Sequence, residues 1–532
     1  METRVKDPKA LIQQAFSMHR SGNIVNAIEI YRKLVKQFPG HAHLLFLLGS
    51  AEIQLGNGLE GVKILAHSLE ISPNNPDAHY NRGNALRGLN RLDEALQSFD
   101  SALELKPGHA DAYISRGNIL GALNRPSEAL QSFDRALELK PDHADAHISR
   151  GNALRGLNRL DEALQSFDRA LELKPDHAQA HNSRGTALQD LNRLDEALQS
   201  FNRSIELRPD YAYAHWNKSL LLLLNGDFEN GWKLYEWRWK SVARREVQRN
   251  FHQPLWLGQE FIADKSILIY AEQGLGDVIQ FCRYLSMIEN LGAKIILEIP
   301  RSLMSLISTL KCGFSMVEKG HQIPPFDFQC PIMSLPYALK TTVKTIPSDI
   351  PYLFADSQKR SVWSKKLGTK SMLRVGLVWS GSATHYNDRN RSLELNLLQS
   401  LFDLPVEFHS LQKEYGEKDE LLLNQTTLLR NHQVEMVDFS DTAALVSEMD
   451  LVISVDTSVA HLAGALGKTV WILLPFAPDY RWMLDRSDSP WYPTATLFRQ
   501  FAVGDWGGVI NEIRNKLEEL VKSTSAFKLS AR

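Results

Sequence analysis

The chain has 532 residues, enough for two to four domains, and its 43% hydrophobic and 23% charged content is typical of folded globular proteins, which excludes general disorder. Its 60 basic and 62 acidic residues nearly balance, so the composition disfavours nucleic acid as a partner. The three cysteines, Cys282, Cys312 and Cys330, form no CxxC pair, which argues against a disulfide framework and against a cysteine zinc site.

The N-terminal segment and the longest apolar run of the central region give no sign of export or membrane insertion. The segment METRVKDPKALIQQAF is charged and amphipathic, unlike a signal peptide, which has a basic stub followed by an apolar core. The run LLLLL at 220–224 is far too short to span a bilayer. We therefore expect a cytoplasmic protein with no transmembrane segment.

The first half of the chain repeats itself. The segment that begins at Asp77 returns at Asp111, Asp145 and Gln179. Four residue types hold fixed places in it: the glycines Gly83, Gly117, Gly151 and Gly185, the alanines Ala95, Ala129, Ala163 and Ala197, the phenylalanines Phe99, Phe133, Phe167 and Phe201, and the prolines Pro107, Pro141, Pro175 and Pro209. This period and these places resemble the tetratricopeptide repeat, a helical hairpin whose arrays form docking surfaces. Degenerate copies on both sides extend the predicted array over residues 8–245, with about seven repeat-like units.

Two polar features of the repeats are candidates for binding. The arginine ladder, defined as Arg82, Arg116, Arg150 and Arg184, stands where the family usually has leucine. The favoured interpretation is that the aliphatic stems pack along the helices, and the alternative is that the guanidinium groups bind an acidic partner. In the family, asparagines at the places of Asn84, Asn118 and Asn152 line the concave groove, so these three are predicted to dock an acceptor, although they are also common family consensus.

The second half alternates predicted strands and helices. Strands are predicted at 266–273, 293–300, 373–382, 406–412, 434–440, 450–456 and 469–475, and helices at 277–292, 302–310, 395–402, 442–449 and 458–467. This alternation predicts parallel sheets with helices on both faces. An irregular stretch at 337–372 separates two such halves, assigned to residues 262–360 and 371–524.

Polar residues follow four of the predicted strands, at the edge where such sheets bind ligands. The first loop, in the stretch AEQGLGDVIQFCRYL, contains Gly274, Gly276 and Asp277 but matches neither a dinucleotide fingerprint nor a P-loop. The others contribute Ser380, Gly381, Arg389 and Arg391, then Gln412, then Asp456, Thr457, Ser458 and His461. Taken singly, these residues are better explained by ordinary structural roles: Asp277 and Asp456 as helix caps, His461 as a buried histidine and Arg391 as a solvated arginine. Together they predict a site for a phosphate-bearing ligand, because a capped helix start is an anion site.

The strand–GLGD–helix opening and the segment VDTSVAHLAGALGKTVWILLP resemble the bacterial ADP-heptose:lipopolysaccharide heptosyltransferases of glycosyltransferase family nine, over about residues 265–500. The resemblance implies an inverting enzyme of the GT-B fold, with two Rossmann-like domains that face a cleft. It implies that Asp277 is the general base, that Arg391 or Arg389 steadies the departing phosphates, and that Asp456, Thr457, Ser458 and His461 hold the donor. The aromatic residues Trp482, Trp491 and Tyr492 are assigned to core packing, with stacking on a sugar as the alternative.

Together, the two halves predict an α-solenoid followed by an α/β glycosyltransferase. The expected reaction needs no metal and no cofactor, uses a nucleotide sugar as donor substrate, and acts on a protein or glycan acceptor recruited by the repeats. The alternative is an interaction scaffold whose second half is vestigial and at most binds nucleotide.

Overall fold

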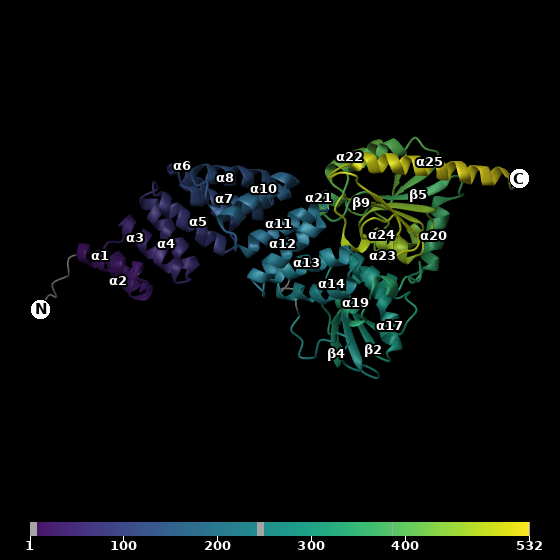
Figure 1. The fold of residues 1–532 in the computed structure, drawn as a ribbon, viewed down its shortest axis with the longest axis horizontal. Coiled ribbons are helices and arrows are strands. Elements are labelled where there is room, and N and C mark those ends of the chain that lie inside the picture. The colour runs from purple at the N-terminus through teal and green to yellow at the C-terminus, as the bar shows by residue number, and fades with distance from the viewer. Residues whose placement is uncertain (1–7, 242–248, 386, 531–532) are drawn as a thin grey trace. The chain divides into compact units, whose positions relative to one another are not determined.

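The computed structural model describes residues 8–241, 249–385 and 387–530. They divide into two compact units, the first ending at Leu188 and the second beginning at Gln189. Figure 1 shows helices alone in the purple and blue part of the chain and parallel sheets in the teal to yellow part. The predicted end of the repeat array, residue 245, lies outside the described residues.

The first unit consists of helical hairpins. Its helices are α1 (Pro8–Arg20), α2 (Ile24–Gln37), α3 (Ala42–Gln54), α4 (Gly58–Ile71), α5 (Pro76–Gly88), α6 (Leu92–Leu105), α7 (Ala110–Ala122), α8 (Pro126–Leu139), α9 (Ala144–Gly156) and α10 (Leu160–Leu173), and the division between units falls within α11 (Ala178–Asp190). Each odd-numbered helix up to α9 packs against the even-numbered helix that follows it. The predicted all-helical solenoid is therefore confirmed.

The hairpin turns share one backbone conformation. A residue with positive φ recurs once in each repeat: Gly22, Gly56, Asn90, Asn124, Asn158, Asn192 and Gly226. Each follows the first helix of a hairpin, where a left-handed residue ends an α-helix and satisfies its last carbonyl groups. Asparagine tolerates this conformation better than other residues with a side chain, which explains its use in the central copies.

The repeated glycines let the two helices of a hairpin approach closely. A Cβ on Gly117 would lie 2.6 Å from Cε1 of Phe133, and one on Gly151 would lie 2.5 Å from Cε1 of Phe167. Phe133 and Phe167 are themselves buried. The phenylalanine ring of the second helix thus occupies the space that a side chain on the first helix would need.

The second unit begins with helices and continues into a four-stranded sheet. Its helices before the sheet are α12 (Leu194–Leu207), α13 (Ala212–Leu224), α14 (Phe228–Tyr235) and the 3-10 helix η1 (Glu236–Lys240). The strands are β1 (Ser266–Tyr270), β2 (Lys294–Ile299), β3 (Phe314–Glu318) and β4 (Phe328–Pro331), in the order β3-β2-β1-β4 with parallel pairing. Helices α16 (Leu275–Phe281), η2 (Cys282–Tyr284), α17 (Leu285–Asn290) and α18 (Arg301–Ile307) connect the first strands, and η3 (Ile332–Ser334), α19 (Leu335–Ala338) and η4 (Val343–Thr345) follow β4.

A second parallel sheet follows in the same unit. Its strands are β5 (Leu373–Val378), β6 (Val406–Ser410), β7 (Leu429–Asn431), β8 (Leu451–Val455), β9 (Val470–Leu474) and β10 (Ala495–Arg499), in the order β10-β9-β8-β5-β6-β7. Its helices are α20 (Ser357–Leu367), α21 (Asp388–Arg391), η5 (Leu395–Leu401), α22 (Glu417–Gln425), α23 (Phe439–Ser447), α24 (Ser458–Ala465), η6 (Tyr480–Trp482) and α25 (Trp506–Ser530). The prediction of an α/β region with parallel sheets is confirmed.

The strand predicted at 434–440 is wrong. The strand that pairs with β6 is β7, a few residues earlier, and Val434 and Val437 are 85% and 79% exposed. Asp438 instead begins α23, where its carboxylate accepts hydrogen bonds from the Ser440 and Asp441 amides. The apolar residues that suggested a strand therefore belong to an exposed turn and a helix cap. The helix predicted at 395–402 is the 3-10 helix η5.

Within the second unit, one hydrophobic core joins α13, α14, the first sheet and helices of the second sheet. Arg283, which is buried, crosses this core. Its guanidinium donates to the Trp491 carbonyl oxygen (2.7 Å), the Pro347 carbonyl oxygen (2.9 Å) and the Tyr352 hydroxyl (2.9 Å). Among the helices of the described chain, none is both long and apolar enough to span a bilayer.

Candidate functional site

The candidate residues lie where the strand order of each sheet changes direction. In the first sheet the chain leaves β1 for β2 and β3 and returns to its other side as β4, and in the second sheet β8 returns beside β5. Ligands of parallel sheets bind at the carboxyl ends of the strands at such switch points. The loops after β1, β5 and β8, which contain most of the candidates, flank these two points.

Asp277 lies in the first turn of α16, directly after β1. One carboxylate oxygen, Oδ2, accepts a hydrogen bond from the Gly274 amide at 2.7 Å, so the side chain closes the turn in which Gly274 is the N-cap. The other, Oδ1, pairs with Arg481 of η6. Asp277 is therefore an ordinary cap and also the partner of a charge from the second sheet's half.

Arg481 is the residue of this site that the sequence reasoning missed. Its side chain is only 10% exposed, and besides Asp277 it contacts Asp479 (2.8 Å) and donates to Gln280 Oε1 (2.7 Å). Burying a guanidinium without a paired negative charge is costly, and the carboxylates of Asp277 and Asp479 offset that cost for Arg481. The segment PDYRWMLDRSD is rich in arginine and aromatic residues, which marks it in the sequence as unusual. This composition does not indicate which residue Arg481 contacts.

Gly276 brings the starts of α16 and α24 together. A Cβ on Gly276 would lie 3.0 Å from Cδ2 of His461 and 3.3 Å from Cα of Ser458. The absence of a side chain at this position therefore lets the two helix N-termini, one from each sheet's half, come into contact. Each N-terminus carries a partial positive charge, which favours an anion nearby.

His461 and Asp456 are next to each other at the end of β8. His461 Nε2 is 4.0 Å from Asp456 Oδ1, its Nδ1 is 3.0 Å from the Tyr492 hydroxyl, and its ring stacks on Trp482 with centroids 5.4 Å apart. Burial, and secondarily the Arg481 charge, holds the pKa of His461 well below its ordinary value, so the imidazole is neutral. Burial and the Asp479 charge raise the pKa of Asp456 to about 6.

Thr457 is the N-cap of α24, but its hydroxyl makes no capping hydrogen bond. It lies 3.1 Å from the Ser454 hydroxyl instead. Trp482, Trp491 and Tyr492 are fully buried, which agrees with their assignment to the core. Stacking of these rings on a sugar would require them to be exposed.

The loop after β5 reaches the end of β8 through Arg391. Arg391 donates to the Asp456 carbonyl oxygen at 3.0 Å and lies 3.4 Å from Asp388, while its neighbour Arg389 is exposed. A Cβ on Gly381 would clash with Nη2 of Arg391, so the guanidinium lies against the glycine backbone. The structure thus brings Arg391, Gly381 and Asp456 together.

Gln412 is engaged within the protein. Its amide oxygen accepts from the Trp379 and Ser380 backbone amides (3.1 and 3.2 Å), and its amide nitrogen donates to the Ser380 carbonyl and hydroxyl oxygens and to the Glu414 carbonyl oxygen (2.9, 3.0 and 2.7 Å). It fixes the loop after β5 through Ser380. Among the described residues, no group of three or more histidine, cysteine or acidic side chains is placed to hold a metal ion.

The arginine ladder has partners inside the array. Arg116 lies 2.6 Å from Asp100 of the preceding hairpin and 2.7 Å from the Ser132 hydroxyl of its own hairpin. Arg150 makes the same two contacts one repeat later, with Asp134 and Ser166, both at 2.6 Å. The ladder therefore joins consecutive repeats through ion pairs and hydrogen bonds.

The asparagines predicted to dock an acceptor differ in exposure. Asn118 and Asn152 are exposed, and Asn84 is half-buried. By contrast, Asn81 donates to the Ser50 hydroxyl at 2.9 Å and so takes part in packing between hairpins.

Models of the tetratricopeptide repeat match residues 9–41, 76–109, 114–178 and 178–211. The predicted identity of the repeats is therefore confirmed. A curated relative, Protein FlbA of Caulobacter vibrioides, is 24% identical over 332 residues, which cover 58% of this chain and 55% of that protein. The chain thus spans about half the length of the curated relative it matches.

Solved structures with similarity to the chain include the tetratricopeptide-repeat protein YrrB, at 25% identity and a TM-score of 0.33 over 36% of this chain and 98% of that one. A tetratricopeptide-repeat protein from Parabacteroides merdae matches at 18% identity and a TM-score of 0.39, over 45% of this chain and 95% of that one. MamA matches at 23% identity and a TM-score of 0.30, over 32% of this chain and 94% of that one.

Proposed function

We propose that the second unit is an inverting glycosyltransferase of the GT-B type, which moves a sugar from a nucleoside-diphosphate sugar to an acceptor. The tetratricopeptide repeats support a role in binding proteins, and in this proposal they recruit a protein or glycan acceptor. The observation that carries the proposal is the ion pair between Asp277 and Arg481, which joins the two sheets' halves beside the start of α24. A carboxylate, guanidinium groups and a helix N-terminus are the groups that a displacement at a sugar phosphate requires.

In the proposed reaction, Asp277 accepts the proton of an acceptor hydroxyl. The hydroxyl oxygen forms a bond to the anomeric carbon while the bond from that carbon to the phosphate oxygen breaks. Attack from the side opposite the leaving group inverts the carbon, and the nucleoside diphosphate leaves with the electron pair of the broken bond. Arg391 and the N-terminus of α24 offset its negative charge, and the ion pair with Arg481 positions the Asp277 carboxylate.

A second candidate is an interaction scaffold whose second unit at most binds nucleotide. It is favoured by the bonding of Asp277, since both carboxylate oxygens already accept hydrogen bonds, one from Gly274 and one from Arg481. A general base in this arrangement must share its lone pairs with these donors.

The test is transfer of label from radiolabelled nucleotide sugars to cell-extract acceptors by the purified full chain and by Asp277→Asn. Loss of a general base is expected to slow transfer by about 100- to 10,000-fold. Stabilisation by the cognate nucleoside diphosphate, about 2.7 kcal/mol at a hundred times its Kd, should persist in the variant. The matched control is Asp488→Asn, which alters a carboxylate that is 71% exposed and paired with Arg486, and it should transfer at the wild-type rate.

Two results decide against the proposal. Wild-type transfer by Asp277→Asn removes Asp277 from the chemistry. Absence of both transfer and nucleotide stabilisation in the wild-type protein favours the scaffold.

A further inference from the structure

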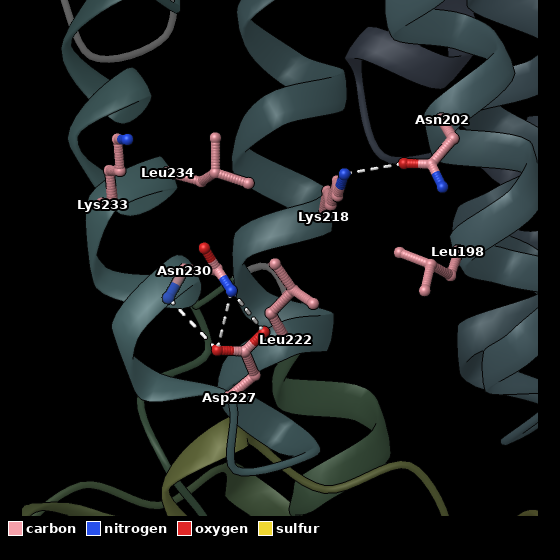
Figure 2. A pocket seen from close by; sticks show the side chains of 8 residues that line it. All are labelled: Leu198, Asn202, Lys218, Leu222, Asp227, Asn230, Lys233 and Leu234. Atoms are coloured by element: carbon pink, nitrogen blue, oxygen red, sulfur yellow. Dashed lines mark hydrogen bonds between the residues drawn. The ribbon is translucent and has the colours of Figure 1, made fainter. Parts of the chain in front are cut away.

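A pocket lies among α12, α13 and α14, where the chemistry of the arginine ladder changes. Its volume is about 370 Å³, at the lower end of the range for small-ligand sites. Figure 2 shows its lining side chains, which come from all three helices. Leu198, Leu222 and Leu234 form its apolar wall.

In preceding repeats, the place that corresponds to this pocket contains an internal ion pair. The ladder arginine of one hairpin contacts an aspartate of the hairpin before it and a serine of its own second helix, as Arg150 contacts Asp134 and Ser166. The arginine and the serine recur from Arg82 and Ser98 onward, and the aspartate recurs from Asp100 onward. The same three places in the last hairpin are occupied by Asn202, Lys218 and Leu234.

These three replacements remove one negative charge and keep the positive one. Lys218 Nζ donates to Asn202 Oδ1 at 2.7 Å, so a cation that faced a carboxylate in earlier repeats faces a neutral amide here (Figure 2). Leucine in place of serine withdraws the hydroxyl that a ladder arginine uses and adds apolar surface.

The other charged residues of the pocket leave a positive balance. Lys233 also lines it, and among the residues that the structure describes neither lysine forms an ion pair. The one carboxylate, Asp227, caps α14, where it accepts hydrogen bonds from the Asn230 amide (3.2 Å) and the Asn230 side chain (2.9 Å). The pocket therefore contains two lysines and one carboxylate beside its apolar wall, and that carboxylate is bonded to Asn230.

We infer that this pocket binds a carboxylate on a short aliphatic stem, the chemistry of a glutamate side chain or of a free dicarboxylate. The neutral Asn202 amide stands in the place of the ladder aspartate, and the ligand's carboxylate supplies the missing negative charge beside it by pairing with Lys218 and Lys233. Its methylene groups contact the leucine wall. Such a site is independent of the sheets of the second unit, so it stands whether or not the chain transfers a sugar.

The test is ligand-observed saturation-transfer NMR on the full chain with three probes: glutarate, acetyl-Gly-Glu-Gly-amide and acetyl-Gly-Gln-Gly-amide. Saturation transfer from the protein to glutarate or to the glutamate peptide supports the site. Comparison of the signal that each of these two probes gives identifies whether the ligand is a free acid or a peptide. The glutamine peptide should not bind. Equal binding of the glutamine peptide, or binding of none of the probes at about 10 mM, overturns the inference.

Two variants locate the binding. Lys218→Met keeps the aliphatic stem but removes the charge, and it should weaken binding by about tenfold or more. Asn202→Asp restores the ladder carboxylate and should abolish binding, because an internal negative charge then neutralises Lys218 and repels the ligand's carboxylate. Lys63→Met, at an exposed lysine of α4, is the control and should bind as wild type does. Unchanged binding by a folded Asn202→Asp variant overturns the inference even if Lys218→Met fails to fold.

Discussion

Arg150 of the repeat array and Arg238 of the second unit show two ways of placing an arginine in a protein. Arg150 is 26% exposed, pairs with an aspartate that is 44% exposed, and recurs in the same environment at Arg116. Arg238 has no exposed side-chain surface and pairs with Glu272, which is 1% exposed, and with Glu236, while it also donates to the Ser334 hydroxyl. A half-exposed pair such as that of Arg150 can recur in each repeat, and the loss of one pair costs little. The buried pairs of Arg238 occur at one position and support the packing around them.

The largest expected effect is that of Arg238→Met. Removing the guanidinium takes the Arg238 ion pair away from the buried carboxylate of Glu272, which should lower the free energy of unfolding of the second unit by about 3–5 kcal/mol. Urea unfolding followed by tryptophan fluorescence measures this, since all eleven tryptophans lie at or after Trp216 and so report only the second unit.

The matched comparison is Arg150→Met, whose unfolding is measured by far-UV circular dichroism. Its pair is partly solvated, so the cost should be about 1 kcal/mol or less. Equal costs for the two variants would contradict the distinction between repeated and unique ion pairs.

The second unit should also lose stability in acid. His409 and His432 are buried in contact, 3.0 Å apart, and burial lowers the pKa of His409 to about 3 and that of His432 to about 4. The unfolded chain protonates both histidines near pH 6.5, whereas the folded chain keeps them neutral. The free energy of unfolding is therefore highest above pH 6.5 and decreases as the pH falls below that value. At pH 5.5 the loss should be about 1.4 kcal/mol for each histidine.

The measurement is the urea midpoint from tryptophan fluorescence at pH 7.5 and at pH 5.5. A His409→Gln, His432→Gln double variant isolates the two groups, and its midpoint should change less between these pH values. An identical change in wild type and variant would assign the acid sensitivity to other residues.

A further prediction concerns the array and compares two glycines of α7. Gly117→Ala places a Cβ 2.6 Å from the Phe133 ring and should destabilise the first unit by about 1–3 kcal/mol. Gly121→Ala meets no atom within 4 Å and should stabilise it by up to about 1 kcal/mol, because alanine favours the helix.

Thermal unfolding by circular dichroism measures both glycine variants. Opposite signs are expected from the same substitution in one helix. Stabilisation by both would show that the phenylalanine ring moves aside at little cost.

The repeats were predictable because their contacts are local and periodic. Gly117 and Phe133 lie on the two helices of one hairpin, and the same pair returns at Gly151 and Phe167, so self-comparison of the sequence exposes it. The strand ends were predictable for a related reason: a buried strand followed by glycine or a polar residue is a local pattern.

The partners of the site residues were not predictable in this way. Arg481 lies 204 residues from Asp277, and no local pattern links two such positions. Gln412 shows the opposite difficulty, since its place at a strand end suggests a ligand contact whereas its amide is bonded to Ser380 and the neighbouring backbone. The prediction of a strand at 434–440 was wrong because the alternation of apolar and polar residues does not show whether the apolar side chains are buried. Val434 and Val437 are exposed.

Arg283 has a consequence for motion between the two sheets. Its guanidinium, which belongs to the first sheet's half, bonds the Trp491 carbonyl oxygen between β9 and β10. A hinge rotation that separates the sheets must break this bond inside the core, and an unsatisfied buried donor costs about 1–3 kcal/mol. Opening of the second unit is therefore expected as an exchange between two discrete conformers, with the rotated one in the minority, and relaxation-dispersion NMR is the observable suited to that timescale.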